Sequence, residues 1–153
     1  MSIIDWLKRL FGTFEQPSPS DIVPKGSINQ YDIEGKVEIN LRKLNIPFTE
    51  PPKVWIPDIP NTNSMDPAMD YGHNNILIAG ADEENQSIMV DFVKVGDIAV
   101  YRTARLYAIH RIARIGNDDQ GKYFIFKGDN NPVADPDRVR ENQILWLCIG
   151  TIY

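Results

Sequence analysis

The sequence is poor in cysteine and in long apolar runs, and both shortages narrow its interpretation. It has one cysteine, so no internal disulfide can form. Cys148 lies in the apolar run ILWLCIG, a setting typical of a small buried hydrophobe rather than a nucleophile. No run approaches the roughly 18 apolar residues that cross a bilayer, and the N-terminus lacks the features of a signal peptide. We therefore expect a cytoplasmic protein without a membrane span.

The sequence also lacks an excess of positive charge. Lys and Arg total 16 against 21 Asp and Glu, which gives a formal net charge of −5, and the basic residues form no cluster. A protein that binds nucleic acid through its phosphates needs a basic face from which counterions are released. We therefore expect no nucleic-acid partner. The hydrophobic share of 42% and the charged share of 24% are typical of a globular chain.

The chain divides into three segments by residue pattern. Residues 1–16 predict a short amphipathic helix, because apolar side chains recur three or four positions apart. Residues 17–30 carry proline and serine without periodicity, as an extended linker does. Residues 31–153 are expected to form the folded domain. The helical part, residues 2–14, is expected to pack on its own domain or on a partner chain; a membrane interface is the alternative. The sequence does not fix the oligomeric state.

Beyond residue 30 the chain has the pattern of a β protein. Short apolar or alternating runs are separated by Gly, Asn and Asp, which favour turns. The proline-rich run at 51–60 suits a sheet edge, because proline cannot donate to a central ladder. We therefore predict a mainly β domain, either a coiled antiparallel sheet or a partial barrel. The expected strands lie within residues 36–44, 51–60, 74–80, 96–102, 106–115, 121–128 and 144–153.

One tetrapeptide, Ser-Met-x-Pro, begins at Ser64 after an apolar segment. A serine hydroxyl becomes an effective nucleophile only when a base takes its proton and a third group fixes the tautomer of that base. His110 is the candidate base, because a strand would hold its ring at a defined depth. Asp129, Asp135 and Asp137 crowd the loop that follows, and each is a candidate partner for the far nitrogen of the histidine.

The second of the two histidines, His73, lies in the turn-like stretch DYGHNN. Metal binding with nearby aspartates is its alternative role, but the spacing matches no known ligand pattern. The segment from Asp129 to Asp135 also lacks the glycine and the terminal glutamate of a calcium loop. We predict no metal and no other cofactor.

Four motifs occur in an order that resembles one enzyme family. NSMDP, VGDIAVYR, IHRI and KGDNNPVAD follow one another as in type I signal peptidases of the archaeal and endoplasmic-reticulum branch. That branch shares a clan with the LexA-type self-cleaving repressors. The resemblance covers residues 55–153, and HRI with KGDNN is its most specific part, since the bacterial branch and the repressors use a lysine base there. It implies the β-rich fold of that clan.

The resemblance implies a role for each matching residue. Ser64 corresponds to the nucleophile and His110 to the general base. Asp135 corresponds to the acid that orients the histidine, and Asp129 to a second carboxylate required for activity. The resemblance further implies an oxyanion hole formed by the backbone N–H of Ser64 and the hydroxyl of Thr62. Preorganised donors of this kind each lower the barrier by about 3 kcal/mol.

Together these observations predict a soluble serine endopeptidase that cuts an extended polypeptide through an acyl-enzyme. Signal peptidases carry a transmembrane anchor, so a different substrate is expected here unless residues 2–14 dock on a membrane. The alternative from another class is a catalytically inactive module that binds a peptide or partner strand on the same fold. A phage or mobile-element assembly protein is a third reading that the sequence leaves open.

Overall fold

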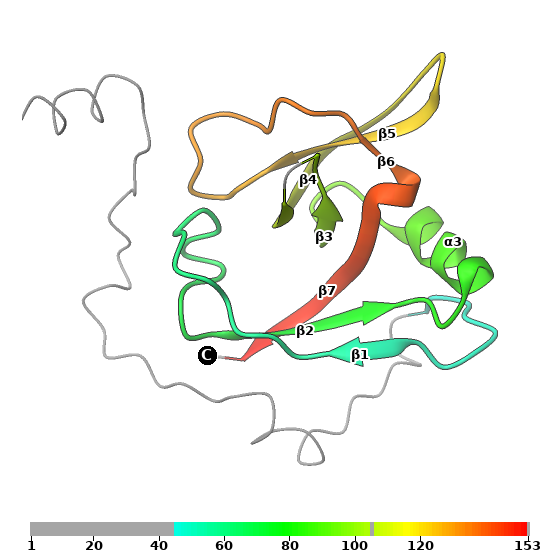
Figure 1. The fold of residues 1–153 in the computed structure, drawn as a ribbon, viewed down its shortest axis with the longest axis horizontal. Helices are drawn as coiled ribbons and strands as arrows, with labels where there is room; N and C mark the ends of the chain where they lie inside the picture. Colours follow the sequence, from blue (N-terminus) through cyan, green and yellow to red (C-terminus); the bar gives the residue numbers. More distant parts are fainter. Residues whose placement is uncertain (1–44, 105, 153) are drawn as a thin grey trace, which may run out of the picture.

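The computed structural model describes residues 45–104 and 106–152. The expected helix at 2–14, the linker at 17–30 and the strand at 36–44 lie outside the described residues. Within them, seven strands form one antiparallel sheet accompanied by a single α-helix (Figure 1). The prediction of a mainly β domain is therefore confirmed, and the sheet is open rather than closed into a barrel. This helix is too short and too polar to cross a membrane.

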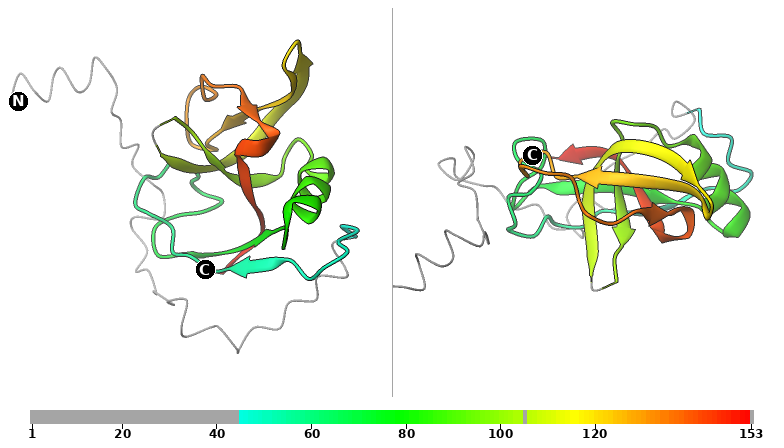
Figure 2. Two further views of the ribbon diagram at one scale, coloured as in Figure 1. Left: turned by 45° about the vertical axis from the view of Figure 1, so that its right-hand side comes forward. Right: turned by 90° about the horizontal axis from the view of Figure 1, so that it is seen from above.

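The sheet has the spatial strand order β1-β2-β7-β3-β4-β5-β6. It coils strongly, so the β4–β5 hairpin rises away from the layer formed by β1, β2 and β7 (Figures 1 and 2). The elements are β1 (Lys53–Trp55), β2 (Asn74–Ala79), the helix α3 (Glu83–Phe92), β3 (Ile98–Arg102), β4 (Tyr107–Asp118), β5 (Gly121–Lys127), β6 (Val139–Arg140), the short 3₁₀ helix η3 (Glu141–Gln143) and β7 (Ile144–Ile152).

The expected edge strand within residues 51–60 is confirmed. Among the strands of residues 45–104 and 106–152, β1 lies at one end of the order and pairs with β2 alone. Prolines flank it on both sides, at Pro52 and Pro57. Proline has no N–H to give to a second neighbour, so its place beside this strand suits an edge.

The helix α3 was not expected; it lies between the strands expected at 74–80 and 96–102, in a stretch for which no element was predicted. The side chain of Asp82 caps it by accepting the backbone N–H of Asn85 at 2.8 Å. Glu83 and Glu84 fill the first turn, where negative charge interacts favourably with the helix dipole. This capping aspartate and the acidic first turn were the signals available in the sequence.

Two apolar clusters fill the domain. The larger one joins the sheet to α3 and includes Tyr101, Phe124 and Phe126. The smaller one contains Ile59, Met65 and Met69, and Cys148 packs against it. Cys148 is half-buried, and burial raises the pKa of its thiol. The smaller cluster lies under the loop that carries Ser64, and so connects that loop to the sheet.

Candidate active site

Ser64 lies in the loop between β1 and β2, at a point where the backbone takes an unusual turn. Asn63, the residue before it, has a φ of 56°. Asparagine adopts this left-handed conformation more readily than most residues, because its short polar side chain can hydrogen-bond locally. Met65 and Met69 are only 3% and 2% exposed and pack beneath the loop. The apolar side chains thus anchor the loop, while the Ser64 side chain stays partly exposed.

His110 projects from the middle of β4 toward this serine. Its Nε2 lies 3.1 Å from the Ser64 Oγ, although the two residues are 46 positions apart in the sequence. β4 pairs with β3 at this point, and His110 is opposite Ala99. The imidazole is 12% exposed, so the sheet holds it in place while leaving one edge open.

Of the three candidate aspartates, Asp135 is the one that contacts His110. Its Oδ2 lies 2.7 Å from the Nδ1 of His110. Its own backbone N–H donates to the carbonyl of Phe126 at 2.8 Å, which ties the loop to the end of β5. Burial alone would raise the pKa of the Asp135 carboxyl, but hydrogen bonds from His110 and Tyr101 lower it below its ordinary value. The carboxylate is therefore ionised at neutral pH.

Asp129 does not contact His110 but pairs with the next residue along β4. The Arg111 guanidinium donates to both of its carboxylate oxygens, from Nε at 2.8 Å and from NH2 at 2.6 Å. Arg111 also donates to the carbonyl of Gly96 at 2.7 Å. Such a two-pronged pair fixes geometry as well as charge. Asp129 therefore holds its loop against β4.

The same loop is bonded to the segment that carries the serine. The backbone N–H of Asn130 donates to the Ser64 carbonyl at 3.0 Å, and its side-chain amide donates to the Asn63 carbonyl at 3.0 Å. Gly128 passes so close that an added Cβ would lie 2.5 Å from the Ser64 carbonyl oxygen. The KGDNN motif thus fixes the backbone on which Ser64 sits.

The groups predicted to form an oxyanion hole are the Thr62 hydroxyl and the Ser64 N–H. The Thr62 hydroxyl is 3.2 Å from the Ser64 Oγ. Among the described residues, no acceptor receives the backbone N–H of Ser64. A cavity of about 320 Å³ opens beside both groups and extends to Asp135. Thr62 and Ser64 therefore border one space.

Tyr101, on β3, belongs to this site but was missed from the sequence. Its hydroxyl donates to the Oδ2 of Asp135 and lies 3.3 Å from the Nδ1 of His110. Burial and the neighbouring Asp135 raise the pKa of Tyr101 well above its ordinary value, so the hydroxyl keeps its proton. Tyr101 and His110 face the same side of paired strands, a relation that the sequence shows only once the register is known.

The remaining candidates do not join this cluster. The Nδ1 of His73 accepts the backbone N–H of Asp70 at 3.1 Å, within its own turn. Asp137 is exposed and affects Tyr101 only through its charge. Across residues 45–104 and 106–152, no group of three or more His, Cys, Asp or Glu side chains is arranged to hold a metal ion.

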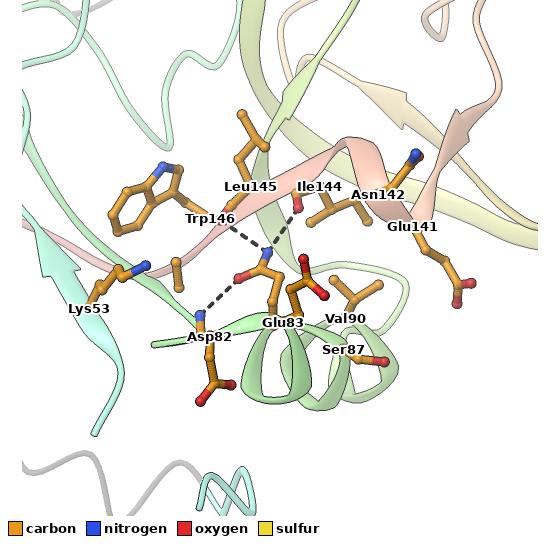
Figure 3. A pocket seen from close by; sticks show the side chains of 13 residues that line it. Lys53, Asp82, Glu83, Ser87, Val90, Glu141, Asn142, Ile144, Leu145 and Trp146 are labelled. Carbon is orange, nitrogen blue, oxygen red and sulfur yellow. Dashed lines mark hydrogen bonds between the residues drawn. The ribbon is translucent and has the colours of Figure 1, made fainter. Parts of the chain in front are cut away.

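A larger cavity, of about 770 Å³, lies beside the start of α3 and contains none of the predicted site residues (Figure 3). Gln86 is one of its lining residues, and its side chain accepts the Gly80 N–H at 2.8 Å and donates to the Ile144 carbonyl at 2.9 Å. These bonds join α3 to β2 and β7. We interpret this region as a structural junction.

Ser64, His110 and Asp135 thus form a hydrogen-bonded line of hydroxyl, imidazole and carboxylate. Such a line can transfer the serine proton to the imidazole while the carboxylate stabilises the resulting cation. Comparisons of the chain with protein-family models, curated proteins and solved structures gave no match. The geometry of this site is therefore the basis on which a function is inferred.

Proposed function

We propose that this protein is a serine endopeptidase of the signal-peptidase-like clan, with Ser64 as nucleophile and His110 as general base. The observation that carries the proposal is the line from Ser64 Oγ to His110 Nε2 at 3.1 Å and from His110 Nδ1 to Asp135 Oδ2 at 2.7 Å. Its members come from a loop, a strand and a second loop. This is the arrangement that the resemblance to the archaeal and endoplasmic-reticulum branch implies.

The reaction follows from the positions of these groups. His110 takes the Ser64 proton as the Oγ attacks the scissile carbonyl carbon, and Asp135 stabilises the imidazolium. The negative oxygen of the tetrahedral intermediate is bound by the Ser64 N–H and the Thr62 hydroxyl. His110 then gives its proton to the leaving amine, and the carbonyl carbon stays bonded to Ser64 as an ester. Water activated by the same imidazole hydrolyses the ester and restores the serine.

β4 offers an edge that suits an extended substrate. It pairs with β3 from Tyr107 onward, whereas its pairing with β5 begins only at Arg111. Between these two residues, no described strand pairs with the edge of β4 that faces away from β3. A peptide that adds to such an edge gains main-chain hydrogen bonds whatever its sequence. It would run alongside His110 and bring a carbonyl group to Ser64.

An apolar groove on the sheet provides a basis for side-chain preference. The groove measures about 420 Å³, and its lining includes Trp55, Tyr107, Ile109 and Trp146. The rings of Trp55 and Trp146 are 5.5 Å apart, and Trp55 is 40% exposed. Alternate side chains of an extended peptide point to one face of the sheet. We therefore expect apolar residues at alternate substrate positions on the acyl side of the cut.

Digestion of a peptide library, read by mass spectrometry, tests the proposal. The wild-type protein is compared with Ser64→Ala and His110→Ala, and Ser87→Ala on the exposed face of α3 serves as the matched serine control. Cleavage by the wild type and by the control, lost in both site variants, is the expected result. Equal cleavage by the wild type and by Ser64→Ala would overturn the assignment.

The open β4 edge and the apolar groove also favour a second candidate function. A module that holds an extended peptide without cutting it needs these two features and no nucleophile. A folded wild type that retains library peptides but cuts none would establish this alternative.

A further inference from the structure

We propose that the Tyr101 hydroxyl is a positioning group of this site, which fixes the Asp135 carboxylate and selects the His110 tautomer with its proton on Nδ1. The kinetic consequence of this inference rests on the proposed peptidase function. The statement about the tautomer does not, because it concerns only the hydrogen bonds among the three side chains.

Two donors converge on one oxygen of Asp135. The Tyr101 hydroxyl and the His110 Nδ1 both contact its Oδ2, and the histidine contact is 2.7 Å long. The tyrosine oxygen is itself 3.3 Å from Nδ1. A proton on Nδ1 can therefore be shared between the carboxylate and the phenol oxygen. A proton on Nε2 instead would leave Nδ1 without a proton to give to Oδ2.

The tyrosine is more deeply buried than the aspartate that it contacts. Tyr101 is 2% exposed, and its ring stacks on Phe126 with centroids 4.0 Å apart and planes 17° apart. Asp135 lies in a loop whose neighbouring residues, Ala134 and Pro136, are exposed. The bond from the Asp135 N–H to the Phe126 carbonyl holds the backbone here, and the position of the carboxylate depends on its own hydrogen bonds. A hydroxyl on a buried strand gives Oδ2 a second fixed partner.

The charge state of each group is consistent with these roles. Tyr101 keeps its proton because burial raises its pKa, so it always donates to the carboxylate. Asp135 is ionised and accepts both bonds. The other charged groups that act on this cluster are Lys127 and Asp137. With Nδ1 as the protonated nitrogen, the Nε2 lone pair faces the Ser64 hydroxyl, which is what a general base requires.

Nitrogen-15 NMR of histidine-labelled protein tests the tautomer directly. The chain has two histidines, so His73→Gln assigns the two spin systems without ambiguity. At a pH where both rings are neutral, the wild type is expected to show the Nδ1–H form of His110 and a slowly exchanging Tyr101 hydroxyl proton. A wild-type His110 protonated on Nε2 would overturn the inference, whether or not any variant folds.

Tyr101→Phe removes only the hydroxyl and keeps the ring stacked on Phe126. We expect a smaller Nδ1–H population, faster exchange of that proton with water, and a kcat lowered about tenfold with KM within about twofold, by analogy with the outer groups that orient metal-bound histidines. Tyr123→Phe, which removes the hydroxyl of another buried tyrosine, should change neither readout. A folded Tyr101→Phe protein with unchanged His110 spectra and unchanged kcat contradicts the inference.

The two proposals fail in different ways. If the wild type cleaves no peptide, the peptidase proposal fails, and the wild-type spectrum still decides the role of Tyr101. If the wild type cleaves and His110 carries its proton on Nε2, the peptidase proposal stands and the Tyr101 inference fails.

Discussion

At the scale of single residues, Gly128 and Asn63 show how closely two loops meet beside Ser64. Asn63 occupies the left-handed region that brings the serine to the rim of the site. Gly128 leaves room for the Ser64 carbonyl, which accepts the backbone N–H of Asn130. Backbone constraints of this kind determine the position of the Ser64 hydroxyl.

We predict that Gly128→Ala lowers cleavage far more than it lowers stability. The added Cβ would lie 2.5 Å from the Ser64 carbonyl oxygen, so the two loops must move apart. The expected loss is about 1–3 kcal/mol of unfolding free energy, typical of overpacking, with a kcat lowered about 100-fold, as for a misplacement of about 1 Å. Urea unfolding and steady-state kinetics measure the two effects. Gly150→Ala, where an added Cβ would make only an ordinary contact with Ile76 at 3.6 Å, controls for glycine replacement away from the loop contact. A Gly128→Ala enzyme with the wild-type kcat would contradict this account.

We predict that replacing Asp135 mainly lowers kcat, whereas replacing Asp129 mainly lowers stability. Asp135→Asn removes the ionised acceptor of His110, so we expect kcat to fall by about 10⁴ with little change in KM. Asp129→Asn weakens the pair with Arg111, which is 37% exposed, and we expect about 1 kcal/mol less stability and a milder loss of activity. Kinetics and urea unfolding on both variants separate these outcomes. Equal kcat losses with equal stability losses would show that both act as one structural unit.

At the scale of elements, the carboxylate of Asp118 links the β4–β5 hairpin to β6. Asp118, at the end of β4, accepts hydrogen bonds from Arg140 at 2.9 Å and from Arg138 at 2.6 Å. The hydrogen bond from Arg140 is the main reason that the pKa of Asp118 lies well below its ordinary value, and the bonds from Gln120 and Arg138 lower it further. Both arginines also lie over the ring of Tyr123. The tip of the hairpin is thus tied to the segment that follows the 128–136 loop.

This pair predicts a specific response to acid. Because the folded-state pKa of Asp118 lies below its unfolded value, its stabilisation is complete above the unfolded value and is lost as pH falls through the folded one. The pKa of Asp135 is also lowered, so its contribution to stability is lost in the same direction as the pH falls. We expect the urea midpoint of the wild type to fall between about pH 5 and pH 2, and that of Asp118→Asn to fall less. Asp119→Asn, at an exposed neighbouring position, is the control. If the urea midpoint depends on pH in the same way in all three proteins, Asp118 is not the source of the acid response.

At the scale of the whole molecule, the order of the described strands leaves the first third of β4 without a partner on one side, beside the site. β4 has β3 on one side throughout its first half, but β5 joins its other side only from Arg111. The coiling of the sheet in Figures 1 and 2 separates the β4–β5 hairpin from the layer of β1, β2 and β7. An unpaired stretch of this kind is a natural place for an extended chain to add.

The open edge predicts that substrates are bound through their main chain. N-methylation of a good substrate peptide should raise KM at every second position on the acyl side and leave the positions between unaffected. Only alternate N–H groups of an added strand point toward its neighbour. A series of singly N-methylated peptides, assayed by steady-state kinetics, measures this. A uniform effect along the peptide would exclude strand addition.

Several features were predictable because they depend on local pattern. The sheet edge at β1 follows from prolines on both sides of Lys53–Trp55, and the strand character of β2, β3, β4, β5 and β7 follows from short apolar or alternating runs. The helix α3 was missed because it has few apolar residues. Of these, Met89 and Val90 are the two that are buried. Its cap at Asp82 was the better signal.

Residue type and spacing are enough to predict the mainly β character of the domain and to select Ser64, His110 and a nearby aspartate as candidates. That Asp135 rather than Asp129 contacts His110, and that Tyr101 joins them, becomes visible in the folded chain. These contacts link residues tens of positions apart, and they depend on strand register and on the path of a loop. Register is fixed by the packing of the whole core, which no local stretch of sequence specifies.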